Sequence, residues 1–139
     1  MRQAQREFVI ETHGPGLYEF TAEVERWLRE VGLKQGLLTL FCRHTSASLL
    51  IQENADPDVV HDLAAFFSRL AAPDGRLYRH TIEGPDDMPA HIRAALTPAS
   101  LTIPVVDGRA ALGAWQGIYL FEHRQRPHRR HMLGHVVGE

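Results

Sequence analysis

The stretch from Ser100 to the C-terminus constrains the fold of this chain most strongly. Residues 100–106 have a strand-like pattern, and Asp107-Gly108, a dipeptide typical of tight hairpin turns, follows them directly. Further strand-like runs follow at residues 109–114, 117–123 and 130–137. Strands joined by such short connections pair with antiparallel neighbours, because a parallel pair needs a much longer crossover. This part of the chain therefore predicts an antiparallel sheet.

The first hundred residues add helices and more strands. Strands are expected at residues 5–12, 37–44 and 48–51, and a short extended piece at residues 77–81. Helices are expected at residues 19–31, from Pro57 onward and at about 88–96. Gly32 is a typical helix stop, and Asp56 before Pro57 is a typical helix start. The order of elements favours an α+β fold, a mainly antiparallel β-sheet or sandwich with two to three helices, in a single domain over residues 1–139.

Composition excludes several classes of protein. The 139 residues are 44% hydrophobic and 23% charged, as in ordinary globular domains, and a net charge of -2 does not favour nucleic-acid or membrane-surface binding. Cys42 is the only cysteine, so no internal disulfide forms. No apolar run approaches the roughly 20 residues that cross a bilayer, and the N-terminus lacks the apolar region of a signal peptide. We expect a cytoplasmic protein with no nucleic-acid and no membrane partner.

Three segments carry more polar and ionisable side chains than a plain fold needs. They are residues 43–48 with 53–56, His80 with residues 83–91, and residues 115–117 with 122–124. They lie where predicted strands and helices meet loops, which is the usual position of working residues. We expect the three segments to meet around one pocket.

Histidines from these segments are candidate metal ligands: His44, His91 and His123. Three imidazoles with one open position form a catalytic zinc arrangement, although their scattered spacing has no close pair such as H-E-x-x-H. His44 could instead be satisfied by a backbone carbonyl, and His123 could lie at a solvated strand end. His91 follows Asp87 by four residues, so a helix places both on one face. One of Asp86 and Asp87 would cap that helix, and the other would orient His91 or bind a cation.

Arginines and hydroxyl groups are candidate phosphate ligands, because the chain has no Gly-rich phosphate loop. Arg109 follows a predicted turn and Arg124 ends a predicted strand, and a guanidinium fork suits a phosphate. Hydroxyl donors could come from the first polar segment: Thr45, Ser46 and Ser48. Cys42 has apolar strand neighbours and is interpreted as a buried apolar residue rather than a nucleophile.

Four stretches resemble the hallmark motifs of the YjbQ family. They are residues 41–49 (FCRHTSASL), 52–59 (QENADPDV), 83–92 (EGPDDMPAHI) and 112–124 (LGAWQGIYLFEHR). The resemblance covers nearly the whole chain. It implies an antiparallel α+β fold and a homotrimer with clefts near the subunit contacts. It also points to a set of site residues: His44, Asp87, His91, Gln116, Glu122, His123 and Arg124.

The resemblance also suggests an activity, because members of the family are often described as secondary thiamine-phosphate synthases. That reaction joins a pyrimidine diphosphate to a thiazole phosphate and releases pyrophosphate, so fixed cations must stabilise the leaving group. The phosphate ligands would be Arg124, Arg43 and Ser46. A zinc or magnesium ion would be held by His44, His91 and His123. The catalytic residues would be His91, Asp87, Glu122 and Gln116, with His91, oriented by Asp87, as the acid or base.

Two alternatives remain open at this point. One is a non-catalytic trimeric module that binds a metal or a small phosphorylated metabolite. The other is a zinc-dependent hydrolase that uses metal-activated water.

Overall fold

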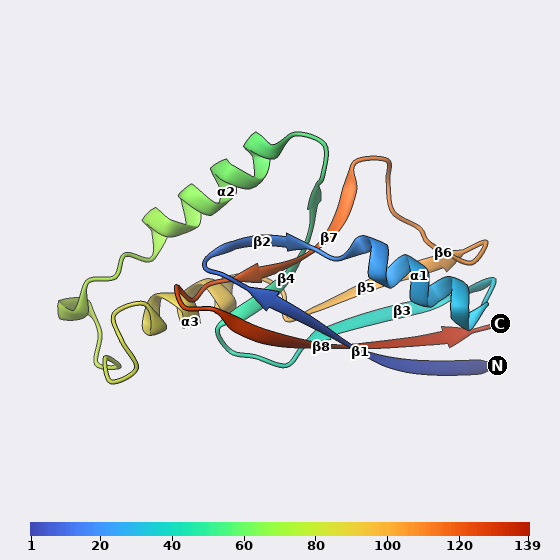
Figure 1. Ribbon diagram of the computed structural model, residues 1–139, viewed down its shortest axis with the longest axis horizontal. Coiled ribbons are helices and arrows are strands. Elements are labelled where there is room, and N and C mark those ends of the chain that lie inside the picture. Colours follow the sequence, from blue (N-terminus) through green and yellow to red (C-terminus); the bar gives the residue numbers. More distant parts are fainter.

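The computed structural model describes residues 1–139, which form two antiparallel sheets (Figure 1). The larger sheet has the order β1-β8-β3-β5-β6, with bounds Arg2–Thr12, His128–Gly138, Gln35–Cys42, Ser100–Val106 and Arg109–Ala110. The smaller sheet has the order β2-β7-β4, with bounds Gly16–Glu19, Gln116–Glu122 and Ala47–Glu53. Every strand pair is antiparallel, which confirms the predicted α+β class.

Three α-helices join these strands: α1 (Thr21–Val31), α2 (Pro57–Leu70) and α3 (Asp87–Leu96). Gly32 ends α1 in the left-handed conformation, with φ 75°, as its sequence position predicts. Asp56 caps α2 by accepting a hydrogen bond from the backbone N–H of Asp58, and Pro57 is the first helical residue, again as predicted. No helix combines the length and apolar character needed to span a membrane.

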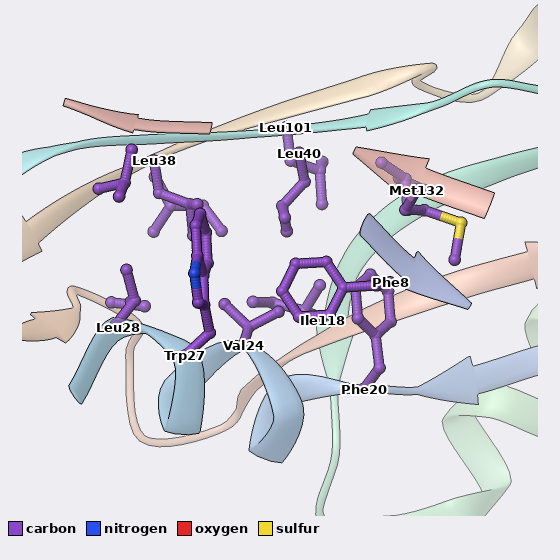
Figure 2. Packing of buried hydrophobic residues seen from close by; sticks show 14 of the residues in the cluster. Phe8, Phe20, Val24, Trp27, Leu28, Leu38, Leu40, Leu101, Ile118 and Met132 are labelled. Carbon is purple, nitrogen blue, oxygen red and sulfur yellow. The ribbon is translucent and has the colours of Figure 1, made fainter. Parts of the chain in front are cut away.

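The core lies between the inner face of the larger sheet on one side and α1 with the smaller sheet on the other (Figure 2). On β3 the alternate residues Leu38, Leu40 and Cys42 are buried, as the period-2 pattern of a strand requires. The indole of Trp27 packs edge-on against the ring of Phe8, with ring centroids 5.7 Å apart.

Gly134 on β8 leaves room for that aromatic pair. A Cβ added at this position would lie 2.8 Å from a ring carbon of Phe8 and 3.1 Å from the ring of Trp27. The small residue therefore permits the two rings to reach the sheet.

Several predicted boundaries need correction. The strand expected at 37–44 ends at Cys42, so His44 lies in a loop. The strand expected at 109–114 stops at Ala110, because the Leu112 N–H turns back onto the Ala110 carbonyl. The extended piece expected at 77–81 is absent, and a short 3₁₀ turn covers Gly75–Leu77 instead.

The predicted Asp107-Gly108 hairpin turn is present. Both residues have positive φ, 50° and 78°, as a type I′ turn requires.

Candidate metal centre

Two imidazoles and one carboxylate meet at the start of α3. The Nε2 atoms of His80 and His91 lie 2.6 Å and 3.0 Å from the same oxygen, Oδ2 of Asp87. Asp87 and His91 are one helical turn apart on α3, whereas His80 comes from the preceding loop. The potential ligand atoms of the three residues lie within 4.8 Å of one another. Two imidazoles with one carboxylate are a ligand set that zinc and related divalent ions use.

The hydrogen bonds of His91 restrict which of its ring nitrogens carries a hydrogen. Its Nδ1 lies 3.1 Å from the backbone carbonyl of Thr45, which can only accept, so Nδ1 carries a hydrogen. A neutral imidazole has one N–H, so Nε2 then directs a lone pair at the carboxylate of Asp87. That contact is favourable only with a cation between the two atoms, either a proton or a metal ion.

Asp87 is held in place by Arg124. Asp87 is only 2% exposed, and its Oδ1 accepts a hydrogen bond of 2.6 Å from Nη1 of Arg124. Burial acts to raise the pKa of Asp87, but the hydrogen bond from His80 and the charge of Arg124 outweigh it, so the pKa lies below its usual range. The carboxylate is therefore ionised and oriented at neutral pH, as second-shell contacts of metal ligands require.

The centre is open on one side. The side chains of His80 and His91 are 35% and 33% exposed, although the carboxylate between them is buried. Structural zinc sites are closed by four protein ligands, whereas catalytic sites keep one position for water or substrate. The half-exposed rim leaves the open position that a catalytic zinc site would need.

Parts of all three polar segments meet here, whereas residues 53–56 and 115–117 lie at the other end of β4 and β7. The His91–Thr45 contact joins the second segment to the first. Arg124 joins the third segment to the second through Asp87 and through Asp86, whose Oδ2 accepts from Nε of Arg124 at 2.9 Å.

The grouping of histidines differs from the expected trio, because only His91 of the three belongs to this centre. Nε2 of His44 instead accepts a hydrogen bond of 2.8 Å from the backbone N–H of His131. His123 is 1% exposed, and its Nε2 lies 3.0 Å from Oγ of Ser48. His44 lies outside this cluster because β3 ends two residues before it. His123 lies outside it because its side chain turns into the protein interior beside Phe121.

His80 is the member of this cluster that the sequence does not single out. It lies in the second polar segment, but seven residues and an irregular loop separate it from Asp87. No helical or strand spacing relates the two positions, so only the general excess of polar residues in this segment marks it.

Glu122, a candidate catalytic residue, is fully buried, and both of its carboxylate oxygens accept hydrogen bonds. Its oxygens accept from Oγ1 of Thr12 at 2.6 Å, from Nε of Arg130 at 2.8 Å and from two backbone N–H groups. Gln116 lies at the opposite end of β7, where its Oε1 accepts from the N–H of Gly113. Neither residue contacts the metal centre.

Two of the three candidate phosphate ligands, Arg124 and Ser46, are engaged elsewhere. Arg124 donates to Asp86, to Asp87 and to the carbonyl of Glu83. Oγ of Ser46 accepts from Arg130, and the exposed Arg43 makes no side-chain hydrogen bond.

The fold and the centre define an antiparallel α+β sandwich with a histidine–aspartate cluster at the start of a short helix. A family model described as UPF0047 protein YjbQ-like matches residues 6–139. The chain therefore belongs to the YjbQ family, which confirms the resemblance seen in its motifs.

Individual relatives agree over nearly the whole chain. A UPF0047 protein of Synechocystis sp. is 58% identical, over 99% of this chain and 94% of its own length. The UPF0047 protein YjbQ of Escherichia coli O157:H7 is 40% identical, over 97% and 98%. Among solved structures, a hypothetical protein of Aeropyrum pernix K1 has a TM-score of 0.89 at 31% identity, covering 98% of this chain and 99% of its own. An uncharacterised conserved protein of Clostridium acetobutylicum has a TM-score of 0.86 at 32% identity, over 95% and 99%.

Proposed function

We propose that this protein is a metal-dependent hydrolase whose divalent ion, of the zinc class, is held by His80, Asp87 and His91. One observation carries the proposal: two imidazole nitrogens converge on one ionised carboxylate oxygen. The Thr45 carbonyl leaves the Nε2 lone pair of His91 free for a ligand bond. Three protein ligands leave a further coordination position open.

An ion with an open position makes water nucleophilic near neutral pH and polarises a substrate oxygen. The chain supplies the rest of the arrangement. Arg124 keeps Asp87 ionised and fixes its direction, and Thr45 fixes the ring of His91. The exposed edges of His80 and His91 give a substrate access from solvent.

Hydrolysis fits this geometry better than the synthase reaction. A synthase needs fixed cationic groups for a diphosphate leaving group, but the guanidinium of Arg124 is occupied by two aspartates. Arg43 is exposed and has no partner that orders it. A hydrolase needs only the ion, a water and an open face. That open face also favours a catalytic site over a closed binding module.

The first test is metal binding by the purified protein after treatment with a chelator. Titration calorimetry with zinc should show one ion per chain, and the variants His80→Ala and Asp87→Asn should bind at least about 100-fold more weakly, because each removes one of three ligands. His61→Ala is the matched control, since the His61 side chain is 80% exposed on α2. Equal zinc binding by wild type and Asp87→Asn would refute the centre.

The second test separates catalysis from binding. The zinc-loaded protein is assayed against a panel of esters, amides and phosphoesters. Turnover that the chelator abolishes and Asp87→Asn lowers by at least about 100-fold is expected for a hydrolase. Tight zinc retention with no turnover across the panel would favour the binding module instead.

A further inference from the structure

Arg93 joins α3 to the end of α2. Its side chain leaves α3 about 200° around the helix from that of His91, so the two point to opposite sides. Nε of Arg93 donates to the carbonyl of Phe67 at 3.0 Å, and Nη2 donates to the carbonyl of Ala71, the residue that ends α2, at 2.8 Å. No other hydrogen bond joins the two helices.

The guanidinium of Arg93 is buried at this junction. The residue is 9% exposed and forms no salt bridge. The carbonyls at the C-terminal end of a helix carry partial negative charge, which compensates a cation in part. Because a planar guanidinium donates to both carbonyls in one fixed geometry, Arg93 sets the direction in which the chain leaves α2.

The chain that leaves α2 brings His80 to the metal centre. Residues 71–86 connect α2 to α3 at one end of the molecule, with a single short 3₁₀ turn between the helices (Figure 1). The hydroxyl of Tyr78 donates to the carbonyl of Ala72 at 2.8 Å, so the connection folds back on its own beginning. His80 follows two residues later, where its Nε2 reaches Oδ2 of Asp87.

The other end of this connection is held by Arg124. Its Nη2 donates to the carbonyl of Glu83 at 3.0 Å. His80 therefore lies between two arginine contacts, that of Arg93 on the side of α2 and that of Arg124 on the side of α3. Since α3 itself places Asp87 and His91, His80 is the member of the cluster whose position depends on the connection.

We propose that Arg93 is a positioning residue of the metal centre, through which the position of α2 regulates metal affinity. While Arg93 holds the end of α2, His80 stays within reach of the ion, and when α2 moves away His80 is withdrawn. The inference rests on the proposed metal centre. The coupling acts in both directions, so a bound ion that holds His80 also holds the end of α2. Movement of α2 is feasible because none of its residues is buried.

The first test is titration calorimetry with zinc on chelator-treated protein. Arg93→Gln should bind zinc about 10- to 100-fold more weakly than wild type, the loss typical of residues that orient metal ligands. Tyr119→Phe is the matched control, because it removes the hydrogen bond of a buried side chain to the carbonyl of Glu53, at the far end of β4, and should bind zinc as wild type does. Equal binding by wild type and Arg93→Gln would overturn this inference alone, whereas a wild type that binds no zinc would overturn the metal centre as well.

Cobalt(II) in place of zinc shows whether His80 is a ligand, because its visible absorption depends on the ligands and their geometry. The spectrum of cobalt-loaded Arg93→Gln should shift from that of wild type toward that of His80→Ala. A substitution that only destabilised the fold would lower the amount of cobalt bound and leave the shape of the spectrum unchanged. An unchanged spectrum in Arg93→Gln would therefore contradict the positioning role.

A third measurement uses the wild-type protein and does not depend on the folding of a variant. Zinc should slow amide exchange at the C-terminal end of α2 and in residues 71–80 at least about tenfold, because the coupling is reciprocal. Amides of β1, which pairs only with β8, should keep their rates. Unchanged exchange in α2 of a protein that binds zinc would show that the helix and the ion are not coupled.

Discussion

At the scale of single residues, Glu122 and Arg130 form a buried ion pair that ties strands from both sheets together. Glu122 ends β7 in the smaller sheet, and Arg130 lies on β8 in the larger one. The two residues are 0% and 3% exposed, and Thr12 at the end of β1 donates to the same carboxylate. The guanidinium also donates to the carbonyl of Ser46. These contacts hold the loop of Thr45 and Ser46, which contacts His91 through the Thr45 carbonyl.

We therefore predict that Glu122→Gln destabilises the fold by about 3–5 kcal/mol, because it leaves Arg130 buried without a counter-charge. Urea unfolding measures the loss. The control Glu11→Gln removes a surface pair with Arg129, whose side chains are 69% and 70% exposed, and should cost at most about 1 kcal/mol. Similar losses in the two variants would contradict the assigned role.

Glu122 also makes the stability of the fold depend on pH in a definite direction. Burial acts to raise the pKa of Glu122, but hydrogen bonds from Arg130 and Thr12 outweigh it, so the folded-state pKa lies below the ordinary value of 4.5. A depressed pKa gives stability that is present above the unfolded-state value and is lost as pH falls through the folded-state value. The extra stability of wild type over Glu122→Gln should therefore shrink below about pH 4.5.

The sequence predicts the contacts of such residues only when their partners lie close along the chain. Asp87 and His91 were paired correctly because one helical turn relates them. The sequence does not relate His80 to Asp87, since His80 reaches the carboxylate from an irregular loop. Glu122 looked reactive because its buried partner, Arg130, lies on another strand and nothing local relates the two.

At the scale of elements, α2 is the helix held least firmly by packing. None of its residues is buried, and Phe66 and Leu70 are each 51% exposed. One clear contact with the sheets is the edge-on packing of Phe67 against Phe121, with ring centroids 5.3 Å apart. Most helices depend on tertiary packing for stability, so the start of α2 depends on its cap more than usual.

We predict that Asp56→Ala loosens α2 without unfolding the sheets. Losing the cap should cost about 1 kcal/mol and make the amides of α2 exchange with solvent roughly fivefold faster, while amides of β3 and β8 keep their rates. Hydrogen exchange followed by NMR or mass spectrometry measures this. Asp62→Ala, at an 82% exposed position inside α2, is the control. Equal exchange in Asp56→Ala and wild type would show that packing, not the cap, holds the helix.

Local signals also explain which elements the sequence predicts well. The boundaries at Gly32, Asp56 and Asp107-Gly108 were correct because each depends on the conformation of one or two residues. The prediction of a strand over residues 109–114 was wrong, because a strand needs a neighbour along its whole length and β6 pairs with β5 at only two positions. The split into two sheets likewise depends on long-range pairing, such as β1 with β8.

At the scale of the whole molecule, the outer face of the larger sheet carries an exposed apolar patch on β3 and its neighbours. On β3, Leu37 and Phe41 point outward and are 43% and 48% exposed. Their cross-strand neighbours extend the apolar surface, since Leu37 pairs with Val137 and Pro104, and Phe41 pairs with Leu133. An exposed apolar surface on a sheet usually marks a contact with another protein. We propose that this face forms the subunit contact of the homotrimer that the family resemblance implies.

The corresponding prediction is a trimer of the 15.7-kDa chain in solution, measured by light scattering after size-exclusion chromatography. Phe41→Lys places a charge in the middle of the apolar face and should shift the mass toward that of one chain, since an unpaired charge is costly in a buried contact. Phe66→Lys makes the same change at a 51% exposed phenylalanine on α2 and should leave the trimer intact. A wild-type monomer would exclude the assembly. Dissociation by Phe66→Lys alone would move the contact to α2, whose exposed apolar side chains would then be the surface that the subunits bury.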